Sequence, residues 1–487
     1  MKLPLPAAAL SLLLPLASAL AAEGTRRPNV LFIIADDLTY TALGAYGNTI
    51  CRTPNLDRLA AQGTRFTRAY CQGTYCGPSR ASFMSGYYPH ATGTLGYNNP
   101  RPAIGERATW SQHFMQAGYH AARVSKIYHM GVPGGVEDLG PGRDYNGADD
   151  PASWHERFNT PGPEWRAPGT GETLEGNPDG KKPVVGGNTF VVVEADGDDE
   201  EHADGKAAAK AVELIRAQRG KDRPWFLAVG FVRPHVPFVA PRKYFEPYLP
   251  YDKLPLPEKR AGDWDDIPKA GINYKTSANM KMDERRQRKA IGAYYACVSF
   301  MDAQVGKVLA TLKDSGFEDD TIVIFTSDHG YHLGEHDFWA KVSLRDESSG
   351  VPLIIRVPGK RPAVSDSFVE LLDLYPTLAE LCGLDVPARL QGKSIARILD
   401  DPRHRVRDVA FSVAPSSKGF LLRDERYAFL QYGEDAAGGI ELFDAVKDPG
   451  QFTNLAGRPE QAELVRAYRA KLAAKLAEVR SSDLAAR

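Results

Sequence analysis

The chain of 487 residues has no excess of either charge, because 60 lysines and arginines are matched by 61 aspartates and glutamates. It therefore lacks the basic surplus that is typical of nucleic-acid-binding proteins. It also has few cysteines. Their number, five, is odd, and a chain of this length builds a core without disulfide bonds, so we expect no disulfide framework. Tandem repeats are absent as well, and the composition is that of an ordinary globular protein.

The N-terminal segment MKLPLPAAALSLLLPLASALAAEG begins with Lys2, continues as an apolar run and carries small residues at Ala17, Ala19 and Ala21. This pattern is typical of a secretory signal peptide, which we predict over residues 1–22. A membrane anchor is the alternative, but the run is short and contains prolines, which favours cleavage over stable membrane insertion. No cysteine is available for a lipid at the cleavage region. We expect a secreted or periplasmic protein, with bacterial export favoured.

Short apolar runs alternate with stretches of helical periodicity along the chain. Residues 30–35, 225–232 and 321–326 are predicted as buried strands, and residues 110–118 and 294–312 as helices. This alternation predicts an α/β fold with a large, mostly parallel sheet sandwiched by helices. Residues 419–432 alternate apolar and polar side chains, and an alanine-rich helix ends the chain. We therefore expect a main domain over 23–405 and a small subdomain of antiparallel sheet plus helix over 406–487.

A tract rich in Gly, Pro and Asp runs from residue 131 to residue 205 without a steady period. It is too long for a plain connection, so we interpret it as a set of functional surface loops or an insertion. Its acidic cluster could bind calcium, but we favour a solvated acidic loop. The cluster consists of Asp196, Asp198, Asp199, Glu200 and Glu201.

Aspartates follow two of the predicted strands. Asp36 and Asp37 come after residues 30–35, and Asp328 comes after residues 321–326. Open α/β sheets bind ligands at this end of their strands, and three carboxylates gathered there repel one another unless a cation holds them. An isolated Asp-Asp pair would be interpreted as a cap or a turn, but the second site favours a divalent metal. Oxygen ligands favour calcium or magnesium, although His329 is a less usual partner for a hard ion.

Basic side chains are candidates for the same centre. Fixed cations beside a metal suit an anion with several oxygens, such as sulfate or phosphate. The candidate cations are Arg80, Lys126 and Lys341, and the candidate proton carriers are His129 and His235, with His332 or His336 as further candidates.

Cys76 lies in the segment YCGPSRASFMSG, beside a glycine and a proline and four residues before Arg80. These neighbours indicate a shaped, electropositive turn. Cys297 and Cys382 differ, because each lies inside an apolar helical pattern, and we expect both to be inert and buried.

The segment around Cys76 is similar to the signature C-x-P-S-R-x-x-x-[LM]-[ST]-G of type I sulfatases, a family of the alkaline phosphatase superfamily. The match is complete at Cys76, Pro78, Ser79, Arg80, Met84, Ser85 and Gly86. The resemblance is to the iduronate-2-sulfatase-like branch, which shares the histidine at position 329 where many sulfatases carry Asn. It extends over nearly all of the mature chain, through NVLFIIADDL, SKIYH, GFVRPHVPF, IFTSDHGYHLGEHDFWAK and ELFDAVKDPGQFTNL.

The resemblance implies that a separate maturation enzyme oxidises Cys76 to Cα-formylglycine. One hydroxyl of the hydrated aldehyde would attack the sulfur of a sulfate ester, and the second would then expel sulfate. The implied ligands of calcium (Ca2+) are Asp36, Asp37, Asp328, His329 and the modified residue 76. The other implied roles are steadying of the diol by Arg80, neutralisation of sulfate oxygens by Lys126 and Lys341, and proton transfer by His129 and His235.

These observations predict a sulfuric ester hydrolase that removes an O-sulfate from a sulfated carbohydrate, such as a fragment of a uronic-acid-containing glycosaminoglycan or of an algal polysaccharide. Two alternatives stay open: a phosphate or phosphonate ester hydrolase of the same superfamily, and an inactive relative that binds sulfated glycans. The catalytic motif leaves the sugar undefined, because loops build the substrate pocket. Gly350 is a second reason why the substrate pocket stays undefined, since relatives often carry a larger basic residue at this position.

Overall fold

The computed structural model describes residues 27–131, 147–176, 189–415 and 418–484. The predicted signal peptide lies outside these residues, as does part of the tract from 131 to 205. Within the described residues, no helix has the length and apolar character needed to cross a membrane.

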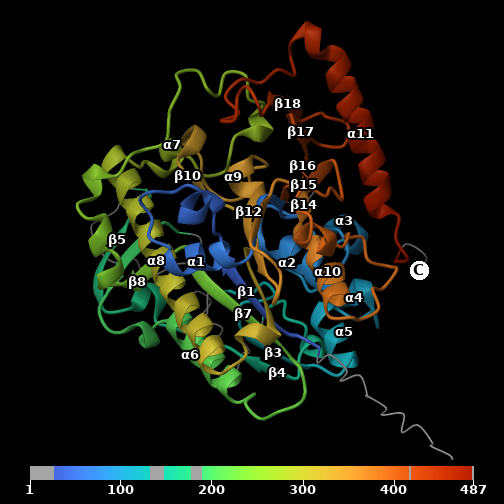
Figure 1. Cartoon of the computed structure of the whole chain (residues 1–487). Helices are drawn as coiled ribbons and strands as arrows, with labels where there is room; N and C mark the ends of the chain where they lie inside the picture. The colour runs from blue at the N-terminus through green and yellow to red at the C-terminus, as the bar shows by residue number, and fades with distance from the viewer. Residues whose placement is uncertain (1–26, 132–146, 177–188, 416–417, 485–487) are drawn as a thin grey trace, which may run out of the picture.

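A large sheet forms the centre of the molecule (Figure 1). Its strand order is β13-β2-β12-β9-β1-β7-β3-β4, with β14 paired to β2. The strands β9, β1, β7, β3 and β4 run parallel, and β12 is antiparallel to both of its neighbours, which confirms a mostly parallel sheet. The bounds are β1 (Asn29–Asp36), β2 (Thr64–Tyr70), β3 (His120–Ser125), β4 (Glu156–Phe158), β7 (Trp225–Pro234), β9 (Thr321–Ser327), β12 (Gly350–Arg356), β13 (Ala363–Ser365) and β14 (Val369–Glu370).

Helices cover both faces of this sheet, and alternate residues of β1 point into two separate cores. Leu31 and Ile33 pack in one core, whereas Phe32 and Ile34 pack in the other. Because side chains alternate across a strand, a strand that is buried on both faces is apolar on both, as β1 is from Val30 to Ala35. The first core includes α1 (Pro54–Gln62), α6 (Ala203–Arg216) and α8 (Glu284–Asp314), and the second includes α2 (Cys76–Ser85), α5 (Trp110–Gln116) and α10 (Leu374–Leu381).

The tract from 131 to 205 is more regular than we expected in its described part. It contributes β5 (Gly169–Thr173) and β6 (Val191–Ala195), which form a three-stranded sheet with β8 (Phe238–Pro241). Residues 191–193 are buried, so β6 shows a continuous apolar run rather than an alternating pattern. The interpretation as surface loops is therefore wrong for this part of the tract.

The acidic cluster within that tract matches the expected solvated loop at four of its five residues, since Asp196, Asp198, Glu200 and Glu201 are exposed. Asp199 is the exception. Asp199 is buried, and its carboxylate lies 2.8 Å from the Nζ of Lys243 and 2.9 Å from the Nζ of Lys307. Although partial burial raises the pKa of Asp199, hydrogen bonds from Lys243, Gln304 and Lys307 hold it below the usual value. Lysines thus balance this carboxylate.

The C-terminal region forms a second, smaller unit, drawn in orange and red in Figure 1. Four antiparallel strands, β15 (Val409–Val413), β16 (Gly419–Asp424), β17 (Tyr427–Tyr432) and β18 (Gly439–Asp444), pack against α11 (Ala462–Arg480). This confirms the predicted sheet and helix. The sheet starts at Val409, and we keep residue 405 as the proposed end of the main domain.

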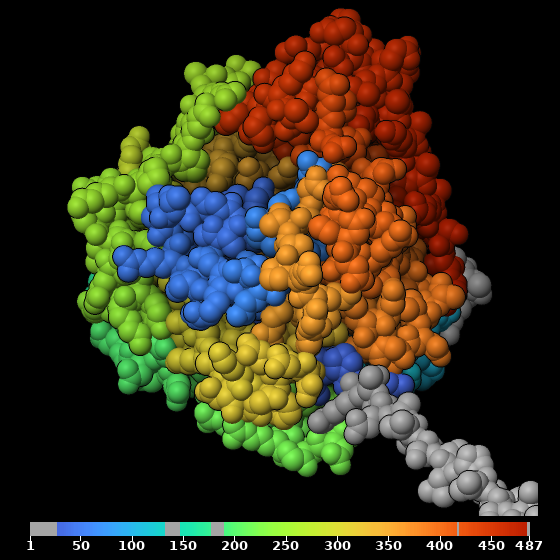
Figure 2. Space-filling view, in the orientation of Figure 1, coloured from blue at the N-terminus to red at the C-terminus, as the bar shows by residue number. Residues whose placement is uncertain are grey.

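The subdomain lies directly against the main domain (Figure 2). Arg345 is a buried link between the two units: its guanidinium lies 2.7 Å from the Oε2 of Glu441 and donates to the carbonyl of Gln451 over 2.9 Å. A second link is the backbone N–H of Thr74, which donates to the carbonyl of Val413 over 3.1 Å. The subdomain therefore contacts the chain two residues before Cys76.

Replacing Arg345 by alanine is expected to lower the free energy of unfolding by about 3–5 kcal/mol, because it leaves the carboxylate of Glu441 buried without its cation. Urea unfolding measures this change. Arg426→Ala is the matched control, because Arg426 is half exposed and pairs with Asp444 at 3.0 Å. It should leave the free energy of unfolding close to that of the wild type, because solvent screens an exposed ion pair. Equal losses from the two variants would contradict the importance of the Arg345 link.

Candidate active site

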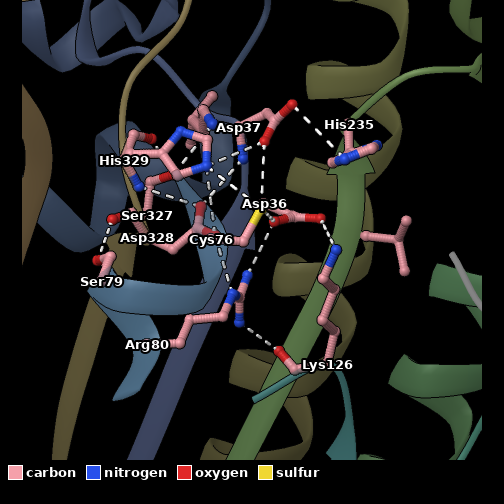
Figure 3. A network of polar contacts seen from close by, with 12 residues as sticks. Asp36, Asp37, Cys76, Ser79, Arg80, Lys126, His235, Ser327, Asp328 and His329 are labelled. Carbon is pink, nitrogen blue, oxygen red and sulfur yellow. Dashed lines mark hydrogen bonds and ion pairs between the residues drawn. The ribbon is translucent and has the colours of Figure 1, made fainter. Parts of the chain in front are cut away.

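Residues that the sequence singled out lie together at the carboxyl ends of neighbouring strands (Figure 3). Asp36 ends β1, while Lys126, His235 and Asp328 directly follow β3, β7 and β9. Parallel strands end at one edge of the sheet, so residues from four parts of the chain meet there. Cys76 comes from the start of α2. Lys341 follows β11 (Trp339–Ala340), which pairs with β10 (His332–Leu333) outside the large sheet.

The two aspartates at the end of β1 are held by a tight turn. Asp37 has a φ of 64°, a left-handed conformation that aspartate tolerates better than most residues. Its backbone N–H donates to Oδ1 of Asp328 over 3.2 Å. The hydroxyl of Tyr294 donates to the carbonyl of Asp37 over 2.7 Å and accepts from the N–H of Thr39 over 2.8 Å. These contacts fix both carboxylates beside Asp328.

Arg80 connects the carboxylates. Its Nη2 lies 3.1 Å from Oδ1 of Asp36 and its Nε lies 2.8 Å from Oδ2 of Asp328, with all three side chains fully buried. Its Nη1 donates to the carbonyls of Lys126 and Ile127 over 2.7 and 3.0 Å. Burial lowers the pKa of Arg80, but the carboxylates of Asp328 and Asp36 raise it by more than burial lowers it. The guanidinium therefore stays charged.

Two lysines balance the remaining negative charge. Nζ of Lys126 lies 2.5 Å from Oδ2 of Asp36, and Nζ of Lys341 lies 2.7 Å from Oδ1 of Asp37. Burial raises the pKa of Asp36, but Lys126 and the other cations hold it well below its usual value. Burial also raises the pKa of Asp37, and Lys341 offsets this only in part.

Cys76 lies at the middle of this charged group. Its Sγ is 3.4 Å from Oδ1 of Asp36, 3.3 Å from Nε2 of His329 and 3.3 Å from Nζ of Lys341. Burial raises the pKa of the Cys76 thiol well above its usual value, and Asp36 raises it further. The expectation of an electropositive turn is therefore incomplete, because carboxylates surround the sulfur as closely as cations do. The unmodified thiol is a poor nucleophile here.

The donors around Cys76 fit a divalent cation. Nδ1 of His329 lies 2.9 Å from the carbonyl of Gly330, to which it donates a hydrogen bond, and this contact directs Nε2 toward the carboxylates. Nε2 lies 3.2 Å from Oδ1 of Asp37 and 3.6 Å from Oδ2 of Asp328. A ring nitrogen and carboxylate oxygens gathered in this way can all act as ligands of one cation.

Two groups of possible ligands meet at the centre, each with its donor atoms within 4.8 Å of one another: Asp36, Cys76, Asp328 and His329 in one, and Asp36, Asp37, Cys76 and His235 in the other. Oδ2 of Asp37 is buried without a hydrogen bond, as expected of an atom reserved for a metal. Oxygen donors predominate, which suits calcium or magnesium. His235 is an addition, since the sequence indicated only proton transfer for it.

The candidate proton carriers separate into two pairs. Burial lowers the pKa of both His129 and His235, and the lysines of the centre lower it further, so both rings are neutral bases. His332 and His336 lie elsewhere. His332 is buried beside the ring of Phe338, and Nδ1 of His336 lies 2.9 Å from Asp263. Neither belongs to the metal-binding groups of the described residues, so their interpretation as proton carriers gains no support.

Gly350 has a structural role. A Cβ atom there would lie 2.6 Å from the carbonyl of Asp346 and 2.9 Å from the ring of Tyr40, so no larger residue fits. Its small size therefore follows from packing at the start of β12.

Two models of known protein families match this sequence. The family model described as Sulfatase matches residues 28–384, which is most of the chain. This chain belongs to the sulfatase family. A further model, described as the C-terminal part of N-sulphoglucosamine sulphohydrolase, matches residues 334–480 of this sulfatase.

Named relatives span most of the chain. A sulfatase of Formosa agariphila is 32% identical over 462 residues, covering 92% of this chain and 86% of its own. The iduronate 2-sulfatase of Homo sapiens is 32% identical over 404 residues, covering 74% of this chain and 70% of its own. Such relatives show that this sulfatase is a sulfuric ester hydrolase.

Solved structures share the alkaline-phosphatase-like fold. One is a complex with its substrate D-glucosamine-2-N,6-O-disulfate, with a TM-score of 0.71 and 21% identity over 95% of this chain and all of that one. Another is a phosphonate monoester hydrolase from Silicibacter pomeroyi, with a TM-score of 0.74 and 24% identity over 93% of this chain and 96% of that one.

Arg233, which we did not predict, holds the turn that carries His235. Its Nη1 donates to the carbonyls of His235 and Pro237 over 2.7 and 2.5 Å, and its Nη2 pairs with the buried Glu164. Asp204 accepts the N–H of Arg233 over 2.9 Å. The only signal in the sequence is the position of Arg233 within RPHVPF, two residues before the histidine.

Arg233→Lys in this sulfatase is expected to lower kcat/KM for an aryl sulfate by about a hundredfold. One ammonium group cannot bond to two carbonyls and to Glu164 together, so His235 would be displaced, and a displaced catalytic group slows the reaction. Steady-state kinetics measures the change, with circular dichroism to confirm folding. Arg242→Lys is the control, since Arg242 forms an exposed pair with Asp196. A kcat/KM equal to that of the control would exclude this positioning role.

Proposed function

We propose that this sulfatase hydrolyses an O-sulfate ester on a sulfated saccharide. It would use a bound calcium ion and a Cα-formylglycine that is formed from Cys76. The observation that carries the proposal is the position of Cys76, whose Sγ lies within 3.4 Å of Asp36, His329 and Lys341. A buried neutral thiol has little nucleophilic power there, whereas an aldehyde hydrate would bring two hydroxyl groups to the same position.

The reaction follows from the residues around position 76. One hydroxyl of the hydrate attacks sulfur while the bond from sulfur to the sugar oxygen breaks. The second hydroxyl then loses its proton, the bond from carbon to the sulfate oxygen breaks, and the aldehyde and inorganic sulfate are formed. A serine at this position would lack the second step, because its sulfate ester would need attack by water.

Each neighbouring side chain has a role in this scheme. Lys126 and Lys341 neutralise sulfate oxygens. Arg80 fixes the positions of the hydroxyls relative to the carboxylates. His235, which starts as a neutral base, takes the proton that the attacking hydroxyl loses and passes it to the departing sugar oxygen. His129, neutral because burial lowers its pKa, takes the proton of the second hydroxyl.

Calcium would be held by Asp36, Asp37, Asp328, His329 and residue 76. When bound, it neutralises the carboxylates and polarises an oxygen of the sulfate group.

The relatives support a sugar as the substrate. They include an iduronate 2-sulfatase and a structure with a disulfated glucosamine, so a fragment of a uronic-acid-containing polysaccharide is our candidate. The predicted signal peptide supports a secreted or periplasmic location, where such polysaccharides are found. Conversion of Cys76 requires a maturation enzyme as a partner.

A second candidate function is hydrolysis of phosphonate or phosphate esters. It is favoured by one observation, the TM-score of 0.74 with a phosphonate monoester hydrolase. Sulfate and phosphonate groups are both tetrahedral anions, and the cations and the metal of this centre would stabilise either one.

The mass of the tryptic peptide Ala69–Arg80 from protein made in the native host tests the nucleophile. We expect Cys71 to be alkylated and residue 76 to carry an aldehyde that reacts with hydrazide. The same preparation should release sulfate faster than phosphonate from matched aryl esters, and Cys76→Ala should release neither. Full alkylation of both cysteines would overturn the formylglycine mechanism, and faster phosphonate release would favour the second candidate.

Calcium should stabilise the folded protein, because it binds carboxylates that repel one another in its absence. After treatment with a chelator, adding calcium at 100 times its Kd is expected to stabilise by about 2.7 kcal/mol, measured as a rise in Tm. Asp328→Asn should abolish the rise, whereas Asp196→Asn, in the acidic cluster that follows β6, should retain it. The opposite pattern would place the calcium site in that cluster, and a wild-type protein without a rise would exclude calcium.

A further inference from the structure

Two tyrosines are exposed beside the buried reaction centre. Cys76 is only 1% exposed, whereas Tyr97 is 53% exposed and Tyr274 is 46% exposed. Among the exposed large hydrophobic side chains of the described residues, these two are the aromatic ones. Both are close to the same centre.

Tyr97 lies over the first turn of α2. A Cβ atom on Gly77, the neighbour of Cys76, would lie 3.1 Å from Cδ1 of Tyr97. The tyrosine ring stacks on His129, with centroids 4.1 Å apart and planes at 24°, and meets the ring of Tyr75 edge to face at 5.8 Å. These neighbours fix the ring, and more than half of the side chain stays open to solvent. A fixed aromatic surface loses little conformational entropy when it binds a ligand.

The segment that carries Tyr274 is tied to the strand before Lys341. The side-chain amide of Asn273 donates to the carbonyl of Trp339 over 2.7 Å, and the N–H of Trp339 donates to the carbonyl of Lys275 over 3.0 Å. Trp339 lies two residues before Lys341, so these bonds on either side of Tyr274 tie it to the strand that delivers the lysine. Burial of the part of Tyr274 that solvent does not reach raises its pKa to about 12, Lys341 lowers this pKa, and Asp37 and Cys76 raise it.

We propose that Tyr97 and Tyr274 form a sugar-binding subsite, in which their rings contact the apolar C–H faces of the pyranose that carries the sulfate. Lys126 and Lys341 are buried and reach only the charged end of a substrate, so the sugar meets the exposed groups nearest Cys76. Tyrosine suits such a contact, because it combines a broad apolar face with a hydroxyl that hydrogen-bonds to sugar hydroxyls. The subsite rests on the proposed function, since it binds the sugar of the same reaction.

The subsite predicts selectivity by shape. A cyclic saccharide sulfate gains contact with the rings, and inorganic sulfate, which has no ring, gains none. Substitution of either tyrosine should therefore weaken saccharide binding and leave sulfate binding unchanged. It also links recognition to proton transfer, because Tyr97 contacts both the sugar and His129.

The first test is calorimetric binding of heparin and chondroitin sulfate disaccharides to protein in which Cys76 is unconverted. Tyr97→Ala and Tyr274→Ala should each weaken the tightest disaccharide at least tenfold. Tyr97→Phe and Tyr274→Phe keep the ring and should stay within threefold of wild type. Leu249→Ala is the control, because Leu249 is as exposed as Tyr274. Unchanged affinity in both alanine variants, or no disaccharide binding by the wild-type protein, would overturn the subsite.

The second test uses converted enzyme. KM for the same disaccharide should rise about tenfold in the alanine variants, and inhibition by inorganic sulfate should change less than twofold. Binding without sulfate release would refute the proposed function and keep the subsite. Sulfate release with an unchanged KM in both alanine variants would refute the subsite and keep the function.

Discussion

The bridge from Arg80 to Asp36 and Asp328 is the interaction on which the rest of the centre depends. Three buried carboxylates at the end of a sheet would be unstable without fixed positive charge, since removing one partner of a buried ion pair leaves an uncompensated charge. Arg80 supplies that charge from the first turns of α2, and its remaining hydrogen bonds reach the backbone after β3. One side chain thus connects the ends of three strands with the helix that begins at Cys76.

The parallel sheet makes this gathering possible. Strands β9, β1, β7 and β3 are neighbours, and each sends an ionisable residue to the same edge, although these residues are up to 292 positions apart in the sequence, from Asp36 to Asp328. The two cores on either side of β1 hold the strands rigidly. Rigid strands position ionic groups more accurately than loops do, which is why a centre of alternating charges can be built here.

Much of this could be predicted from the sequence, because the decisive signals are local. The apolar runs before Asp36 and Asp328 identified buried strands, and the rule that ligands lie at strand ends brought the two sites together. Signals failed where long-range packing decides. Arg233 depends on Glu164 and Tyr97 contacts His129, both distant in the sequence. The strand β6 lacks an alternating pattern because it is buried. His332 and His336 are near Lys341 in sequence, but the turn between β10 and β11 directs them elsewhere.

The burial of Cys76 also sets an order of events. The residue is 1% exposed, it begins a helix packed against the sheet, and the chain just before it pairs with Val413 of the C-terminal subdomain. The proposed conversion of Cys76 needs access to its side chain, which the folded protein buries. The conversion would therefore have to precede the closure of the main domain and the docking of β15. The chemical competence of the centre would then be decided while the chain is still unfolded, before the residues that use it have met.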